Sequence, residues 1–238
     1  MQIRGRRRCQ DCGHEWSYFD TGSVACPDCG SLRSVGTGDR QRHTDAPVAL
    51  DLSTHRAALD GVTDLGDVAD ELKTTLREYV RRRGFVRGGD LRTVDDTLLA
   101  AGELLHAVDV FERIRGPPSD SVRLYLIDLL SGADAGERPD PSAVPDAMAD
   151  ARGLAYAEVL DRFCTDLGKW LDDNPDPAGE RVRESLDTHV RRVSAVYGDV
   201  SPAEAEALVR AARDLVAYLS TEDEAALATA DERLSGLE

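Results

Sequence analysis

The sequence predicts a mostly α-helical protein, with a small cysteine-stapled β module at the N-terminus followed by an all-α bundle of six or seven helices. The first observation is a pair of Cys-x-x-Cys motifs near the N-terminus, separated by thirteen residues. The second is a change of hydrophobic period, from alternation in the first part of the chain to a helical spacing from residue 55 onward. We therefore expect a ribbon at residues 1–36, a linker at 37–54 and an acidic helical domain at 55–238.

The four N-terminal cysteines have the spacing of a structural zinc site. Cys9 and Cys12 form one pair and Cys26 and Cys29 the other, and a glycine follows each pair. Four thiolates saturate a tetrahedral Zn²⁺ and leave no open position for a catalytic water. We predict one structural Zn²⁺ per chain, bound as the module folds. His14 is an alternative ligand, but with four cysteines present we expect it on a strand surface.

Residues between the two motifs alternate as a β-strand requires. His14, Trp16 and Tyr18 fall on one face. A turn at residues 20–22 and a returning segment at 23–25 then predict a hairpin. A further strand could come from either flank, at Ile3 or at residues 32–35. Together these features predict a zinc ribbon.

The motif Cys9-x-x-Cys12-Gly13, the aromatic Trp16 and the motif Cys26-Pro27-x-Cys29-Gly30-Ser31 carry a specific resemblance. Over about residues 1–36 they resemble the zinc ribbon at the N-terminus of the general transcription initiation factor B. The cyclin-type repeats of that factor are not recognisable downstream, so a promoter-loading role is not implied. The whole chain is similar to an uncharacterised family of haloarchaeal proteins in which such a ribbon precedes a helical region. This resemblance implies a haloarchaeal source and a ribbon followed by a helical region.

Charge is strongly unbalanced and unevenly distributed. Acidic residues number 45 and basic residues 29, giving a net charge of −16, and the chain contains only two lysines. Residues 1–43 hold seven arginines and five acids, so the excess of negative charge lies in the remainder. High salt screens such self-repulsion. The composition therefore predicts a halophilic protein, and it argues against phosphate binding by most of the surface. The resemblance to the haloarchaeal family implies an archaeal one.

Targeting signals are not recognisable in the sequence. The N-terminus lacks the pattern of a signal peptide, and no apolar run approaches 18 residues. In a reducing compartment, paired cysteines indicate a metal site more readily than disulfides. We expect a cytoplasmic protein with no membrane association.

The helical region shows apolar residues at three- and four-residue spacing. The predicted faces begin at Leu65, Leu91, Val122, Tyr156, Val182 and Ala205, and a short last helix is expected at 222–235. Ser201 and Thr221 carry capping-box signals, and no strand is expected after residue 55. A bundle is the first choice of architecture, and a short solenoid of helix pairs is the alternative.

Two arginine groups are candidates for contacts with a partner. In the ribbon they are Arg4, Arg6, Arg7 and Arg8, with Trp16 and Tyr18 as aromatics that could stack on unpaired bases. The alternative is that Trp16 covers the zinc knuckles and the arginines offset the charge of the zinc centre. In the helical region the candidates are Arg81, Arg82, Arg83 and Arg87. There the alternative is local, since arginines in a last turn complement the helix dipole, Gly84 ends the helix and Asp90 caps the next.

Two fragments resemble catalytic motifs without completing one. Glu103-x-x-His106 matches half of a di-iron carboxylate site, but no second copy exists. Cys164 with His189 suggests a thiol nucleophile, yet Cys164 lies on an apolar stripe where cysteine is usually inert. We therefore expect a protein that is not an enzyme. Its ribbon would contact a protein partner, plausibly in transcription or translation machinery, and the alternative is direct binding of nucleic acid by the ribbon.

Overall fold

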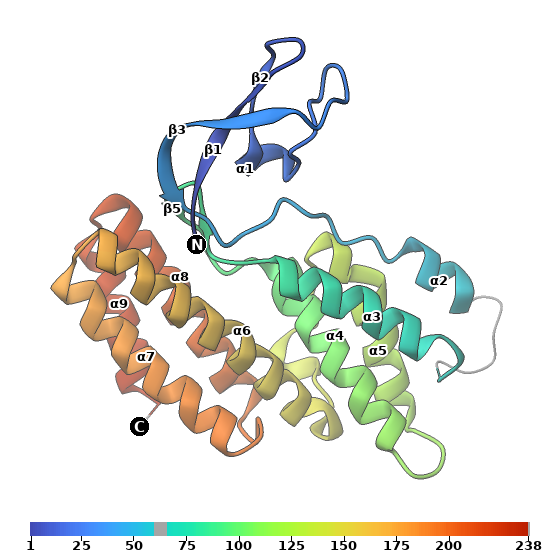
Figure 1. The fold of residues 1–238 in the computed structure, drawn as a ribbon. Coiled ribbons are helices and arrows are strands. Elements are labelled where there is room, and N and C mark those ends of the chain that lie inside the picture. The colour runs from blue at the N-terminus through green and yellow to red at the C-terminus, as the bar shows by residue number, and fades with distance from the viewer. Residues whose placement is uncertain (60–65, 238) are drawn as a thin grey trace.

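The computed structural model describes residues 1–59 and 66–237. It confirms the predicted fold class: a small three-stranded sheet carrying the four cysteines sits against a region built of helices (Figure 1). Leu65, predicted on the first long helix, lies outside the described residues. Within the described part of the chain, no helix is long and apolar enough to cross a membrane.

The ribbon sheet is built on the segment before the cysteines. Strand β1 (Gln2–Cys9) lies in the middle, between β2 (Glu15–Ser17) and β3 (Ser34–Arg42), and both pairings are antiparallel. The hairpin predicted between 14–19 and 23–25 is therefore wrong. Residues after Ser17 instead form the one-turn helix α1 (Tyr18–Thr21), which ends at Gly22 with φ +63°. The carbonyl of Ser23 accepts from the Trp16 indole at 3.0 Å rather than pairing in a sheet.

The predicted linker is ordered in two places. Strand β3 continues to Arg42, six residues past the expected end of the ribbon, because it pairs with the whole length of β1. Helix α2 (Ser53–Leu59) then forms before the described chain is interrupted. His55 of α2 is buried and hydrogen-bonds Thr75 of the next helix at 2.9 Å.

The seven longer helices account for the predicted bundle, and their bounds follow in chain order. They are α3 (Gly66–Arg82), α4 (Asp96–Arg113), α5 (Asp120–Gly132), α6 (Asp146–Asp173), α7 (Pro177–Ala195), α8 (Pro202–Thr221) and α9 (Glu224–Ser235). Helix α6 packs against α4, α7 and α8, as its central position in Figure 1 shows. In a solenoid of helix pairs, α6 would likewise contact its own partner α7 and the first helix of each adjacent pair, so these contacts agree with both predicted architectures.

Side-chain caps fix several helix starts. Ser201 accepts from the backbone N–H of Glu204 at 3.1 Å, which confirms the predicted cap of α8. The cap expected at Thr221 is wrong, since Asp223 caps α9 by accepting from Ala225 N at 3.0 Å. The cap expected at Asp90 is also wrong. Asp95 begins α4 instead, accepting from Leu98 N at 2.7 Å.

Asp90 belongs to a hairpin that the sequence analysis did not predict. Strands β4 (Val86–Arg87) and β5 (Asp90–Leu91) pair antiparallel across Gly88-Gly89. Both glycines have positive φ, +60° and +90°, as a tight hairpin turn with right-handed strand twist requires. The expectation of no strand after residue 55 is therefore wrong.

The ribbon is tied to this hairpin by a segment we call the clasp, residues 42–46. The Gly89 N–H donates to Arg42 O at 2.9 Å, and the Thr44 N–H donates to Val86 O at 2.8 Å. The Thr44 hydroxyl donates to Asp166 of α6 at 2.6 Å and accepts from the backbone N–H of Val86 at 3.1 Å. The clasp therefore holds the trailing end of β3 against both the hairpin and α6.

Asp45 of the clasp is fully buried and carries two ion pairs. Its carboxylate accepts from Arg83 Nε at 2.8 Å and from Arg87 Nη2 at 2.5 Å. The Gly84 N–H also donates to it, at 3.3 Å. Burying one carboxylate between two guanidiniums compensates its lost hydration.

Asp45→Ala should lower the free energy of unfolding by about 3 kcal/mol, because it leaves two partly buried guanidiniums without their carboxylate. Urea unfolding followed by far-ultraviolet circular dichroism measures this. Asp39→Ala, at an exposed position of β3, is the matched control and should change stability little. Equal effects of the two substitutions would contradict a structural role for Asp45.

A second buried ion pair lies in the helical core, between Glu103 of α4 and Arg152 of α6. Both side chains are fully buried, and Arg152 Nε donates to Glu103 Oε1 at 2.6 Å. Tyr156 donates to Glu103 Oε2 at 2.8 Å, and Tyr125 donates to Oε1. Burial raises the pKa of both tyrosines, so they remain neutral donors. The network continues toward the surface through Arg138, Asp96, Glu206 and Arg213.

Candidate metal centre and the arginine face of the ribbon

Two tight knuckles present the four cysteine sulfurs. The Gly13 N–H donates to Cys9 O at 3.2 Å, and the Gly30 N–H donates to Cys26 O at 2.9 Å. Gly13 and Gly30 have φ +79° and +72°, a conformation that a residue without Cβ adopts at little cost. The sequence therefore folds each Cys-x-x-Cys-Gly stretch into a turn that points both of its thiols inward.

The sulfur geometry fits a tetrahedral metal ion. All four Sγ atoms lie within 4.8 Å of one another, and within the described chain they form a group that could hold a metal ion. Cys9 Sγ lies 3.7 Å from Cys29 Sγ, and Cys12 Sγ lies 3.6 Å from Cys26 Sγ. A Zn–S bond of about 2.3 Å gives a tetrahedral S···S edge of about 3.8 Å, whereas a disulfide bond is about 2.05 Å long. The arrangement therefore matches metal ligation rather than a pair of disulfides.

Backbone amides prepare the cluster for thiolates. The N–H groups of Cys12 and Asp11 point at Cys9 Sγ and lower the pKa of that thiol to about 6. At Cys12 the His14 N–H acts in the same direction, but burial and the neighbouring sulfurs outweigh it and raise the pKa to about 12. A bound cation would favour thiolates throughout, because it compensates the repulsion among four sulfurs.

Trp16 forms the small core of the ribbon. It is buried together with Cys9 and Cys26 in a cluster separate from the helical core. The predicted alternative for this residue, covering the knuckles, agrees with its burial. His14 lies just before β2, is exposed and stacks beside Trp16 with ring centroids 6.3 Å apart, so it is a surface residue as expected but lies outside the strand.

The predicted arginines of β1 differ in their surroundings. Arg8 lies 3.8 Å from Glu15 in an exposed pair. Arg4 donates to the Gly38 carbonyl at 2.6 Å, and Arg7 donates to the Ser34 hydroxyl at 3.0 Å. Arg4, Arg6, Arg7 and the neighbouring Arg40 form no ion pair with any carboxylate of the residues that the structure describes. The charge of these four guanidiniums is therefore not offset by a carboxylate, although Arg4 and Arg7 each donate to an oxygen of the ribbon.

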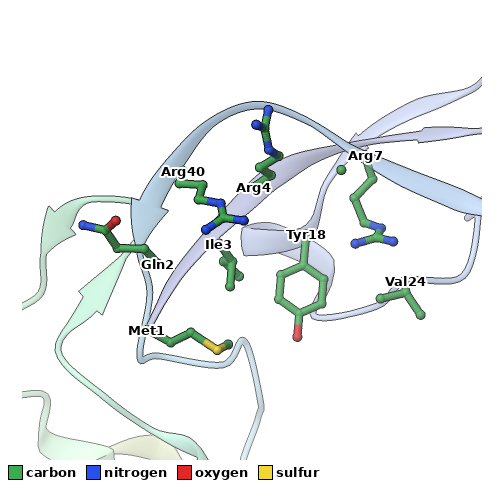
Figure 2. Close-up of a pocket in the computed structure, with 9 residues that line it drawn as sticks. Met1, Gln2, Ile3, Arg4, Arg7, Tyr18, Val24 and Arg40 are labelled. Carbon is green, nitrogen blue, oxygen red and sulfur yellow. The ribbon is translucent and has the colours of Figure 1, made fainter.

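An open groove of about 420 Å³ lies along this side of the ribbon (Figure 2). Tyr18 occupies its middle, and the side chains of Arg7 and Arg40 extend toward it from two sides. The remaining wall is mainly apolar and includes Met1, Ile3 and Val24. We call this feature the ribbon groove. The structure thus brings Arg4, Arg7 and Tyr18 of the predicted set to one place.

Arg40 is the functional candidate that sequence reasoning missed, because it fell in the predicted linker. Antiparallel pairing of β3 with β1 places Arg40 directly opposite Arg4. The segment Ser34–Arg42 contains two glycines and four consecutive polar residues, so no local alternation marked it as a strand, and no turn next to β1 marked the pairing.

The second predicted arginine group serves the fold. Arg83 and Arg87 pair with buried Asp45, and Arg83 also contacts Asp95 at 2.6 Å. Arg82 lies 3.7 Å from Glu78, one turn earlier on α3. The remaining member, Arg81, is exposed. These contacts favour a structural role for the arginines around the end of α3 over a role in binding a partner.

Glu103 and His106, the two residues of the first catalytic-looking fragment, have different partners. Glu103 is engaged by Arg152 and two tyrosines, whereas His106 contacts Glu158 at 3.1 Å. Burial raises the pKa of Cys164 to about 12, so its thiol stays protonated at neutral pH. Both observations agree with the expected structural roles.

The fold and the cysteine cluster define a mostly helical protein with an N-terminal four-cysteine ribbon that could hold a metal ion. The chain belongs to DUF7117, a family of unknown function, whose match spans residues 1–234. The family therefore includes both the ribbon and the helical region.

A shorter likeness links part of the chain to a curated protein. A 31-residue stretch is 61% identical to hydrogenase maturation factor HypA of Chlorobium luteolum (strain DSM 273 / BCRC 81028 / 2530). The stretch is 13% of this chain and 26% of that protein, so the chain spans about a quarter of the length of this relative. No solved structure matches the chain. The resemblance to the ribbon of initiation factor B stays a prediction.

Proposed function

We propose that this chain is a zinc-binding, non-enzymatic interaction protein whose ribbon contacts a macromolecular partner. The observation that carries the proposal is the four-cysteine cluster, whose sulfur separations of 3.6 and 3.7 Å fit the edge of a ZnS₄ tetrahedron. Cys9, Cys12, Cys26 and Cys29 would hold the ion, and four thiolates would leave no position for substrate. The ion would then hold the ribbon together rather than take part in chemistry.

The partner surface in this proposal is the β1–β3 part of the ribbon sheet, where Arg4, Arg6, Arg7 and Arg40 lie close together on the two strands. Four guanidiniums without carboxylate partners contrast with a chain of net charge −16. Such a local excess of positive charge steers and orients an anionic partner. Transcription or translation machinery is the proposed setting, by analogy with other ribbon proteins.

Direct binding of nucleic acid is the second candidate. The ribbon groove favours it, since Tyr18 offers an aromatic ring beside arginines, the combination that stacks bases and contacts phosphates. This candidate requires the same folded ribbon and differs only in the partner.

Metal content tests the first part of the proposal. Elemental analysis of the purified full chain should find one zinc per chain, and a chelator should remove it with loss of the ribbon fold. Capture from native extract tests the second part. The variant with Arg4, Arg6 and Arg7 replaced by serine should lose the partner, and the matched variant Arg81→Ser should keep it. Absence of metal, or equal capture by all three proteins, would refute the corresponding part.

A further inference from the structure

The ribbon sheet pairs two like-charged residues on neighbouring strands. Arg4 of β1 and Arg40 of β3 are directly opposite each other in the antiparallel pairing. Directly opposed residues have Cβ atoms about 5 Å apart, and like charges in such pairs destabilise a sheet. No carboxylate of the described chain neutralises either guanidinium. Arg4 donates to the Gly38 carbonyl at 2.6 Å and its guanidinium points away from Tyr18, so Arg40 is the member of the pair whose charge is directed at the ribbon groove (Figure 2).

The ribbon groove adds an apolar, aromatic floor to this cationic pair. Tyr18 stands between Ile3 and Met1 on one side and Val24 on the other, with Arg7 extending from above (Figure 2). Met1 and Val24 are 76% and 44% exposed, so the apolar surface is open to a ligand. At about 420 Å³ the groove is in the lower part of the size range of small-ligand sites. It suits one planar group and not the folded surface of a protein.

We propose that the ribbon groove binds an unpaired nucleotide of a single-stranded nucleic acid. The base stacks on Tyr18 against the apolar wall, and a phosphate is held by Arg40, with Arg7 toward the neighbouring phosphate or the base edge (Figure 2). A nucleotide joins an aromatic plane to an anion, which matches both halves of the site. An acidic peptide would satisfy the guanidiniums but leave Tyr18 and its apolar neighbours uncovered. The inference rests on the folded ribbon of the proposed function and specifies its partner.

Fluorescence anisotropy with the full-length, metal-loaded protein tests the proposal. The probes are short labelled oligothymidylate and oligouridylate, in a series of KCl concentrations over which circular dichroism shows folded helices. We expect saturable binding of at least one probe. Tyr18→Ala should weaken it about tenfold or more through lost stacking. Arg40→Ser should reduce the slope of log K against log salt by about 0.7, the value for one phosphate contact with a single strand.

A stability readout separates binding from structure. Arg40→Ser removes the repulsion with Arg4, so its unfolding midpoint should equal or exceed that of the unmodified protein while its affinity falls. Tyr197→Ala, at an 80% exposed tyrosine after α7, and Arg81→Ser are the matched controls and should bind like the unmodified protein.

Three results would overturn the inference. They are failure of both probes to bind the folded protein, equal weakening by the groove and control substitutions, and tight binding of a glutamate-rich peptide that Arg40→Ser abolishes while neither oligonucleotide binds. One zinc per chain together with any of these results would leave the proposed ribbon function standing. Absence of zinc would count against the proposed function itself.

Discussion

Replacing Glu103 by alanine is expected to lower the free energy of unfolding by about 3–5 kcal/mol, because it leaves a buried charge without its partner. Arg152 is fully buried, and without Glu103 its guanidinium keeps a hydrogen bond to the carbonyl of Pro139 at 2.8 Å and its place over the Tyr156 ring. One of its terminal nitrogens, Nη1, already has no hydrogen-bond partner. Tyr125 and Tyr156 also lose their acceptor in this variant, so several donors become unsatisfied at once.

Chemical unfolding followed by circular dichroism measures the effect, with Glu184→Ala at an exposed position of α7 as the control. The double variant Glu103→Leu, Arg152→Met replaces both charges with apolar side chains and should recover most of the lost stability. If Glu103→Ala were no more harmful than Glu184→Ala, the pair would not be an important stabilising contact. If the double variant were as unstable as the single one, lost packing rather than the unpaired charge would be the cause.

The double substitution Cys26→Ser, Cys29→Ser should abolish metal binding and unfold the ribbon while the helical core stays folded. It removes two of four thiolates, and structural zinc contributes an apparent free energy of about 10–16 kcal/mol to folding in small modules. The buried core of the ribbon consists of Trp16, Cys9 and Cys26, which is too little to fold alone.

Elemental analysis measures the loss of metal, and hydrogen exchange measures the unfolding of the ribbon. Amides of β1 and β3 should exchange rapidly in the variant, whereas those of α6 should remain protected. Cys164→Ser is the matched control, since this cysteine is buried in α6 away from the cluster and should leave the zinc content unchanged. Retention of metal by the double variant would refute the four-cysteine site.

Elements with dense local signals could be predicted from the sequence. The apolar spacing from residue 122 onward marks α5 to α9 because a helix repeats its buried face every three or four residues. The cysteine motifs likewise identify the cluster, since metal ligation requires that residue type at that spacing. Even the unexpected hairpin had a local signal in Gly88-Gly89, the pair that a type I′ turn favours. The local interpretation instead places a helix end at Gly84 and the next helix start at Asp90, with no strand between them.

Features that depend on distant pairing could not be predicted in this way. Arg40 joins Arg4 only because β3 pairs with β1, with more than thirty residues between them. Asp45 meets Arg83 and Arg87 through a tertiary contact that no sequence period encodes. Clustered arginines therefore looked like a binding surface when their carboxylate partner lay in another segment.

The clasp also determines where the chain can be cut. Removing residues 1–45 would separate the arginine-rich N-terminus from the acidic remainder of the chain. It would also remove Thr44 and Asp45, whose hydrogen bonds and ion pairs stabilise the hairpin and the helices. The shortened protein would expose the Thr44-binding amides of Phe85 and Val86 and leave Arg83 and Arg87 without their shared carboxylate. Its loss of binding would then be mistaken for a property of the ribbon. Point substitutions in the ribbon groove therefore test binding better than a truncation does. Because the ribbon shares the clasp with the helical region, we do not expect it to be transferable intact to another protein.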